Sequence, residues 1–380
     1  MSHHLCHLSL LNPLRHPRIY YKHALSACLA GYQVSVIAQG REEAHYDEAG
    51  IHLIPLAPFD RRSAERLSRR QELYDLALAQ KADAYILHSP ELLRIGQQLK
   101  QKTGAKIIYD VHEDYRLNLR LADYYPWGLR HLVGAFVRFR ERSAVSWLDG
   151  ICYAEDCYEN MLGVPAGKYI LLPNTYTPRA IEGESRLSLP KKDYLLLSGT
   201  IAEERGLWES LAVWEKMQEY KDCALIIAGH CQLPTLLSRL RRWIAERGHQ
   251  DRIHLIGAES YVAAVDIQNL INGCYAGFFL YRSQPNLIGK YPTKLFEYLA
   301  ADKPLIYTDH PHWRAFDQKL RIGVPWKGEK HLAELVNGLQ KWHLNPPQHQ
   351  PEQYQWEANE EGKLLSFLHK LGLQSEGSTK

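Results

Sequence analysis

The sequence lacks the segments that mark membrane-spanning and secreted proteins. No apolar run reaches the ~18 residues that a transmembrane helix needs, and residues 1–9 do not have the charged and then apolar regions of a signal peptide. We therefore expect a cytoplasmic protein, with contact to the inner face of a membrane as its closest approach to lipid.

Patterns that bind metals or form disulfides are also missing. The seven cysteines are scattered, odd in number and without C-x-x-C spacing, which is typical of reduced thiols and argues against a disulfide framework. The 19 histidines form no H-E-x-x-H motif, and no Asp-x-Asp triplet occurs. We expect no metal and no cofactor. The formal net charge of +3 is too small to indicate nucleic acid as a partner.

What the chain does contain is a regular alternation of apolar strands and amphipathic helices. Its 380 residues suffice for two domains. In the first half we expect strands at 5–11, 34–38, 51–56, 84–88, 106–111, 150–154 and 169–173, separated by helices at 17–30, 65–79, 91–102 and 128–148. In the second half we expect strands at 194–198, 224–228, 253–256, 276–280 and 304–307, with helices at 207–220, 234–247, 261–271, 292–300 and 330–342.

This alternation predicts an α/β fold of two Rossmann-like, doubly wound parallel-sheet domains. The polar stretch 177–192 is rich in turn formers and is interpreted as the linker. The domains are placed at 1–178 and 190–345, and a helix at 353–373 is expected to cross back to the N-terminal domain. Such sheets bind ligands beyond the carboxyl ends of their strands, so we expect the two domains to face a central cleft.

The segment Tyr291–Tyr298, with the sequence YPTKLFEY, combines a helix start with candidate binding groups. Pro292 suits a first helical turn, and the free backbone N–H groups there, with Thr293, Lys294 and Leu295, suit a diphosphate. Glu297 lies off the apolar stripe and could accept hydrogen bonds from ribose hydroxyls. An ordinary amphipathic helix with a solvated glutamate is the alternative, and the residues alone favour it.

A turn after the strand at 194–198 and the end of the strand at 106–111 provide two more groups. In SGTIAEERG, Gly199 allows close approach of backbone to phosphate, Thr200 is a neighbouring candidate for donor binding, and Arg205 could neutralise a leaving diphosphate. A plain strand-to-helix turn is the alternative there. In YDVHEDY, His112 stands at a strand end and could also be a structural cap. Its neighbours and other strand-end residues form a possible acceptor side: Arg18, His88, Glu113 and Asp114.

The ordered set of motifs resembles the family 4 (group 1) glycosyltransferases, which have the GT-B fold. The resemblance rests on PTKLFEYLAADKPLI, preceded in order by HPRIYYKHALSACLAGYQVSVIA, ADAYILHSPELL, AKIIYDVHEDY, LLPN, LLLSGTIAEERGL and LIIAGHC. It implies that Glu297 holds the donor ribose, that Arg205 contacts the diphosphate, and that His112 faces the sugar. Many members have a second glutamate eight positions before the first, where this chain has Gly289.

The resemblance further implies transfer with retention of anomeric configuration and without a bound metal, from a UDP- or GDP-sugar to a hydroxyl of a glycan or lipid-linked saccharide. Synthesis of bacterial surface polysaccharide is the expected setting. Two alternatives remain open. A nucleotide-sugar 2-epimerase would turn over a UDP-sugar without acceptor, and a non-catalytic nucleotide-sugar-binding partner of a membrane assembly would show neither transfer nor donor hydrolysis.

Basic and aromatic residues are interleaved at 124–147, and five arginines occur within 61–70. Such a helix is attracted to an anionic membrane surface. The alternative, which we favour from the sequence, is a solvated helix that packs its aromatic side chains inward.

Overall fold

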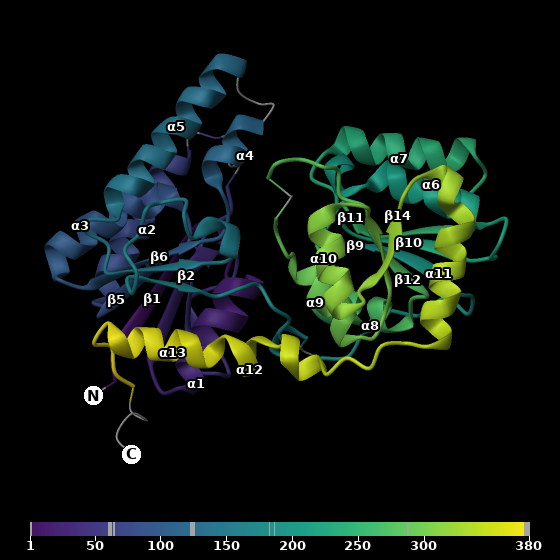
Figure 1. Cartoon of the computed structure of the whole chain (residues 1–380). Helices are drawn as coiled ribbons and strands as arrows, with labels where there is room; N and C mark the ends of the chain where they lie inside the picture. Colours follow the sequence, from purple (N-terminus) through teal and green to yellow (C-terminus); the bar gives the residue numbers. More distant parts are fainter. Residues whose placement is uncertain are drawn as a thin grey trace. The chain divides into compact units, whose positions relative to one another are not determined.

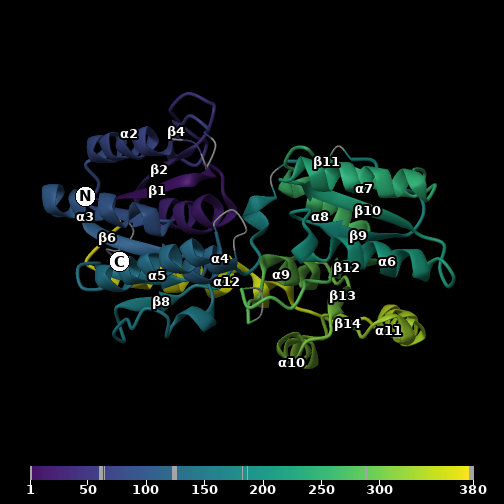
Figure 2. The ribbon, with the colours of Figure 1, turned by 90° about the horizontal axis from the view of Figure 1, so that it is seen from above.

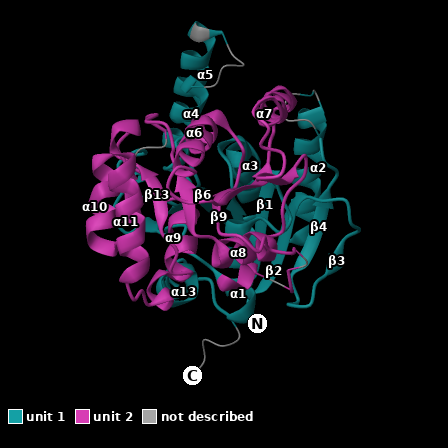
Figure 3. Ribbon diagram, turned by 90° about the vertical axis from the view of Figure 1, so that its right-hand side faces the viewer, with its two compact units in different colours: residues 1–177, 356–380 teal, residues 178–355 magenta. Residues whose placement is uncertain are grey.

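The computed structural model describes residues 2–59, 63, 65–121, 126–181, 183–185, 187–286 and 289–375. The chain divides into two compact units, one formed by Met1–Thr177 with Trp356–Lys380 and the other by Pro178–Gln355 (Figure 3). Each unit is built on a mostly or wholly parallel sheet, so the predicted class of two doubly wound α/β domains is confirmed.

The first unit has an eight-stranded sheet within the described residues. Its strands are β1 (His4–Pro13), β2 (Gln33–Gln39), β3 (His45–Tyr46), β4 (His52–Leu56), β5 (Ala84–Leu87), β6 (Lys106–Val111), β7 (Gly150–Tyr153) and β8 (Tyr169–Leu171). They are ordered β3-β4-β2-β1-β5-β6-β7-β8, and only β3 runs antiparallel to its neighbour. The strand order reverses between β1 and β5, which is where doubly wound sheets place their ligands.

Helices cover both faces of this sheet (Figure 2). They are η1 (Pro17–Ala24), α1 (Leu25–Leu29), α2 (Glu65–Gln80), η2 (Pro90–Leu92), α3 (Leu93–Thr103), α4 (Tyr115–Leu121), α5 (Trp127–Ala144), η3 (Asp156–Tyr158), α12 (Trp356–Asn359) and α13 (Glu361–Lys370). The segment η1 is a π-helix, a rare form that is frequent at functional sites.

Alternation along the strands builds two separate cores in the first unit. Leu8 and Leu10 of β1 belong to the core on one face, whereas Leu5 belongs to the other. The C-terminal helices pack on that second face, where Trp356 and Phe367 are buried. The indole Nε1 of Trp356 donates to Ser26 Oγ over 2.9 Å, which fixes the end of the chain to α1 (Figure 1).

The second unit has a six-stranded sheet within the described residues. Its strands are β9 (Tyr194–Ser198), β10 (Ala224–His230), β11 (Ile253–Ala258), β12 (Ala276–Phe279), β13 (Leu305–Thr308) and β14 (Gly323–Trp326). The order is β11-β10-β9-β12-β13-β14, and every adjacent pair is parallel. This order matches the Rossmann arrangement, with its switch point between β9 and β12.

The helices of the second unit alternate with these strands. They are η4 (Pro178–Ala180), η5 (Glu203–Arg205), α6 (Leu207–Met217), α7 (Pro234–Glu246), α8 (Ala264–Gly273), α9 (Thr293–Ala300), α10 (Pro311–Leu320), η6 (Glu329–His331), α11 (Leu332–Leu344) and η7 (Pro351–Tyr354). None of the helices in the described part of the chain combines the length and apolar character needed to cross a bilayer.

The interpretation of residues 124–147 needs correction. Helix α5 does not pack its aromatic side chains inward, because Phe136 and Phe139 are exposed. Trp147, beyond the end of α5, does contact the core. Residues 124 and 125, the side chain of Trp127, and Arg61 and Arg62 of the basic stretch lie outside the described residues.

Candidate functional site

In the first unit, polar side chains gather at the carboxyl ends of three adjacent strands. Arg18 lies in η1, which follows β1; His88 follows β5, and His112 follows β6. These ends flank the switch point between β1 and β5, where neighbouring parallel strands bring their following residues together. The structure therefore places three of the predicted residues in one group.

The centre of this group is Asp110, a fully buried carboxylate on β6. Arg18 holds it from one side: Nη2 donates to Oδ1 over 2.7 Å and Nε donates to Oδ2 over 2.9 Å. The remaining Arg18 nitrogen, Nη1, donates to the Leu172 carbonyl and the Asn174 side chain. Arg18 is itself buried, so its charge serves this ion pair and faces no solvent.

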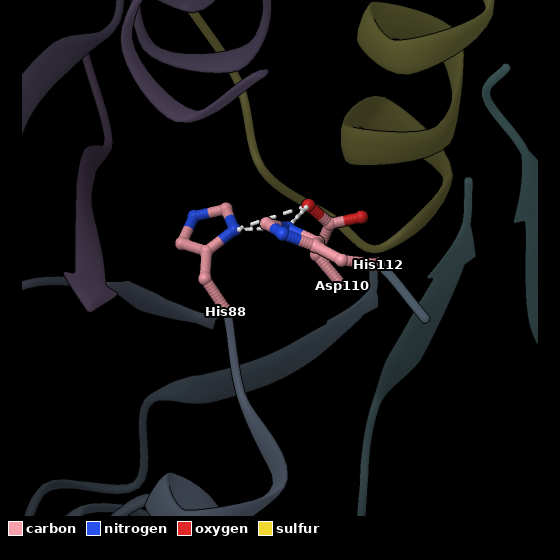
Figure 4. A group of neighbouring side chains, drawn as sticks. All are labelled: His88, Asp110 and His112. Carbon is pink, nitrogen blue, oxygen red and sulfur yellow. Dashed lines mark hydrogen bonds and ion pairs between the residues drawn. The ribbon is translucent and has the colours of Figure 1, made fainter. Parts of the chain in front are cut away.

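Two histidines share the other side of the carboxylate (Figure 4). Asp110 Oδ2 lies 3.0 Å from His88 Nδ1 and 2.7 Å from His112 Nε2, and the two ring nitrogens are 3.2 Å apart. His88 Nε2 contacts His7 Nδ1 at 3.0 Å, so a chain of imidazoles runs from the strand end into the core. Of these rings only that of His112 reaches solvent.

Burial and the Arg18 charge fix the protonation of this cluster. Burial alone would raise the pKa of Asp110, but Arg18, followed by His112 and His23, holds it well below its usual range. Burial lowers the pKa of His88 to about 4, and burial also lowers the pKa values of His7, His16 and His23 well below the ordinary histidine value. The buried rings are therefore neutral at neutral pH, and the carboxylate is ionised.

The trio of His88, Asp110 and His112 also has the spacing of a metal site. Its three facing atoms are 2.7 to 3.2 Å apart, near the ~3 Å between adjacent ligands of an octahedral ion with ~2.1 Å bonds. Hydrogen bonds from both rings to the one carboxylate account for the same geometry. Arg18 already supplies the compensating positive charge, and a dication beside it would be repelled. We interpret the trio as a hydrogen-bonded network.

The other predicted acceptor-side residues have separate surroundings. Asp114 accepts from the Leu117 backbone N–H at 3.0 Å, at the start of α4, and pairs with Arg138 at 2.5 Å. Glu113 is exposed and accepts from Asn118. Both follow the end of β6.

In the second unit, the turn after β9 depends on Gly206. Its φ is +82°, and a Cβ there would stand 2.0 Å from the Leu280 carbonyl oxygen, so a side chain cannot be accommodated. This close approach brings η5, with Arg205, against the end of β12. Gly199 and Thr200 precede η5 on the same turn.

Two cations meet over one aromatic ring at this switch point. The Arg205 guanidinium lies 5.6 Å from the centroid of Tyr281, to whose hydroxyl Nη1 donates over 3.2 Å. Lys294 Nζ lies 5.9 Å from the same centroid and donates to the Phe278 carbonyl over 3.3 Å. Burial, and then the Arg205 charge, lowers the pKa of Lys294 to about 7, although Glu297 acts in the opposite direction. Two cationic side chains thus lie within 5.9 Å of the Tyr281 ring centroid.

The start of α9 adds backbone donors to these cations. Pro292 is the N-cap, with φ of −58° and ψ of 148°, and the backbone N–H groups of Thr293 and Lys294 meet no acceptor among the described residues. The side chain of Leu295 is buried, and its N–H bonds to the Pro292 carbonyl over 2.9 Å. Glu297 is half-buried one turn further along the helix.

Some residues of these groups were not identified from the sequence. Asp110 was passed over because its partner Arg18 is 92 positions away, although a carboxylate inside an apolar strand is itself a signal of a buried interaction. Tyr281 was missed because an aromatic residue after a strand looks like core. The histidines His7 and His23 carry no spacing pattern that would reveal them.

Comparisons with known proteins agree with this architecture. Residues 23–175 match the family model described as the glycosyl transferase 4-like domain. The fold is similar to sucrose-phosphate synthase from Thermosynechococcus elongatus (TM-score 0.66, 13% identity, covering 98% of this chain and 97% of that one). It is also similar to Anabaena HepE in complex with UDP and glucose (TM-score 0.60, 11% identity, covering 98% of each chain).

A third similar structure is a putative UDP-N-acetylglucosamine 2-epimerase from Listeria monocytogenes (TM-score 0.59, 14% identity, covering 99% of this chain and 98% of that one). No curated protein matches the sequence. The two sheets and their switch points define the GT-B fold. The chain has this fold, and residues 23–175 of its first unit match a glycosyl transferase 4-like domain, as the motifs predicted.

From the buried histidines we predict that acid destabilises the folded protein, with a free energy of unfolding that falls as the pH drops below about 6.5. Unfolded histidines titrate near ~6.5, whereas His7, His16, His23 and His88 titrate lower when folded. The unfolded chain then binds more protons, so the free energy of unfolding rises with pH in this window by up to ~1.4 kcal/mol per pH unit for each histidine. Glu141 opposes this by at most one proton, because its pKa is raised to about 7, first by burial.

Urea titrations between pH 4.5 and 7 measure this slope. We expect His23→Phe to reduce it by about one histidine's share, ~1 kcal/mol per pH unit, and the same change at the exposed His254 to leave it unaltered. A stability that does not vary with pH in the parent protein would contradict the assignment.

Proposed function

We propose that the protein transfers a sugar from a UDP- or GDP-sugar to a hydroxyl of a glycan or lipid-linked saccharide, with retention and without a metal, in the bacterial cytoplasm during synthesis of surface polysaccharide. The observation that carries the proposal is the pair of cations, Arg205 and Lys294, beside the free N–H groups of α9. A diphosphate would contact both cations and accept hydrogen bonds from these N–H groups.

Sugar transfer would depend most on the group that stabilises the leaving diphosphate. As the glycosidic bond breaks, negative charge develops on the phosphate, and fixed cations beside it lower the barrier. Arg205 and Lys294 are placed for this task, and both are held near the Tyr281 ring. Glu297, on the same helix as Lys294, would accept hydrogen bonds from the ribose. No carboxylate nucleophile is assigned, and the departing phosphate would take the acceptor proton.

The Asp110 network gives His112 a defined role in the proposal. Its Nε2 faces the ionised Asp110 carboxylate at 2.7 Å, so the neutral ring carries its proton on Nε2. Its other nitrogen, Nδ1, has no partner within the described part of the chain and is left as an acceptor. His112 would therefore accept a hydrogen bond from a sugar hydroxyl. Asp110 acts through His112 as a positioning residue.

The choice between UDP and other nucleotides is supported by similarity alone. HepE, with the same fold, is known in complexes with UDP and with UDP-glucose. The epimerase-like neighbour shares the fold to a similar extent. Turnover of a UDP-sugar in the absence of any acceptor, with the 2-epimer as product, would replace the transferase proposal by an isomerase.

A first prediction concerns binding of nucleotide and nucleotide sugars to the second unit. In a thermal-shift screen of UDP, GDP, ADP and their sugars, we expect at least one diphosphate to raise the melting temperature. Glu297→Ala should lower its affinity about tenfold or more, since a charged hydrogen bond is lost. Glu334→Ala, on an exposed part of α11, is the matched control. If no nucleotide shifts the melting temperature, the donor site is misassigned.

A second prediction uses the lowered pKa of Lys294. Because that pKa is about 7 in the free protein, a bound diphosphate would raise it, and binding near pH 7.5 should take up a fraction of one proton. Isothermal titration calorimetry in buffers of different ionisation enthalpy measures this uptake. Lys294→Arg keeps the charge at all accessible pH values and should bind the nucleotide without proton uptake. Equal uptake by both proteins would show that Lys294 is not the group.

A third prediction separates the hydrogen-bonded trio from a metal site. Dialysis against EDTA should leave donor binding, turnover and melting temperature unchanged, because no step of the proposal requires a metal. Added Co²⁺ should give no d–d absorption bands that disappear in His88→Gln. A loss of turnover with EDTA that Mn²⁺ or Zn²⁺ restores would overturn the metal-independent mechanism.

A further inference from the structure

A row of large apolar side chains lies exposed along one side of α5. Leu129, Leu132, Phe136 and Phe139 have exposed fractions of 45%, 70%, 62% and 66%. Their spacing of three, four and three residues puts them on a single face of the helix. We call these four residues the α5 stripe.

The opposite face of α5 is firmly packed, so the exposure of the stripe does not come from a loose helix. Glu141 is buried and accepts from the Tyr109 hydroxyl at 2.9 Å, and Arg138 is buried and pairs with Asp114 at 2.5 Å. A Cβ at Gly134 would stand 2.9 Å from the Arg116 carbonyl oxygen, which shows how closely α4 approaches. The two helices extend together beyond the end of the sheet (Figure 1).

Single exposed apolar side chains are normal for a protein surface. Elsewhere in the first unit, the exposed Leu29, Tyr46 and Leu67 belong to three different elements, α1, β3 and α2. Four on one helical face form a contiguous apolar surface, which marks an interaction site.

The charge of the two helices α4 and α5 is strongly positive. Residues 115–144 contain six arginines and two acidic residues, Asp123 and Glu141, and Glu141 is buried. Arg116, Arg120 and Arg142 are exposed, and Arg140 is half-buried next to Phe139. A second copy of the chain would bring these arginines together across a two-fold axis, which like charges oppose.

We propose that the α5 stripe, with Arg140 and Arg142 of the same helix, forms a docking surface for an anionic lipid bilayer. The apolar side chains enter the boundary between headgroups and acyl chains, and the arginines contact lipid phosphates. This surface is separate from the residues assigned to donor binding, and the inference stands independently of the proposed transferase chemistry. It would bring the first unit to the place where lipid-linked saccharides are found.

Liposome flotation with the full-length protein tests the apolar part. We expect the parent protein to float with vesicles of phosphatidylglycerol and phosphatidylcholine. Phe136→Ser combined with Phe139→Ser should reduce the bound fraction at least about tenfold, since two apolar side chains no longer enter the bilayer. Both side chains are exposed, so the melting temperature should be unchanged. The control, Tyr261→Ser combined with Leu344→Ser, removes equally exposed side chains elsewhere and should float as the parent does.

A second pair of variants tests the electrostatic part. Arg140→Gln combined with Arg142→Gln should weaken flotation, and 0.5 M salt should weaken it for the parent, because screening shortens the range of the attraction. Arg242→Gln combined with Lys319→Gln on exposed positions of the second unit is the control. Absence of flotation by the parent at low salt would overturn the proposal. A different pair of results would also overturn it: the parent self-associates in sedimentation velocity, and the Phe136 and Phe139 variant abolishes that self-association while its flotation is unaffected. The nucleotide thermal shift, measured on the same proteins, reports separately on the donor site.

Discussion

The ion pair between Arg18 and Asp110 is the interaction on which the organisation of the first unit depends. Asp110 is fully buried, and a carboxylate in that position without a partner would either take up a proton or destabilise the fold. Arg18 meets it with two parallel hydrogen bonds, and removal of one partner of such a pair typically costs ~3–5 kcal/mol. Because the carboxylate stays ionised, it can orient two imidazoles at once.

Arg18 also connects η1 to other parts of the first unit. Arg18 reaches Asp110 on β6 and the Leu172 carbonyl just after β8, so it ties the segment after β1 to two other parts of the unit. The π-helical form of η1 places Arg18 and His23 on the same side of the sheet as Asp110. His23 in turn stacks on Trp356 of α12, with ring centroids 5.3 Å apart, so this C-terminal helix contacts the cluster. Burial lowers the pKa values of His7, His23 and His88, so these three rings are neutral at neutral pH.

The charged side chains of the second unit are arranged differently. Its cations Arg205 and Lys294 share a tyrosine ring, and burial, followed by the Arg205 charge, lowers the pKa of Lys294. In the first unit the Asp110 carboxylate is paired with Arg18 within the protein. In the second unit, the proposed diphosphate would lie beside both cations and would stabilise that region when bound.

Much of this architecture could be predicted from local pattern. Strand and helix alternation identified the two sheets, and Pro292 followed by an apolar stripe identified α9, because these signals are contained within a few residues. Asp110 and Tyr281 could not be found in that way, since their roles depend on partners 92 and 76 positions away. Phe136 was misjudged for a related reason: periodicity shows that a helix has an apolar face, but it does not show which face the protein covers.

The backbone conformation at position 289 accounts for the glycine found there. The resemblance suggested a glutamate there, and its absence looked like the loss of a contact. In the structure Gly289 has φ of +81°, a left-handed conformation that a glutamate adopts only with strain. A glutamate at this position would therefore strain the backbone, and replacing Gly289 alone would disturb the approach to α9 before it supplied a ligand.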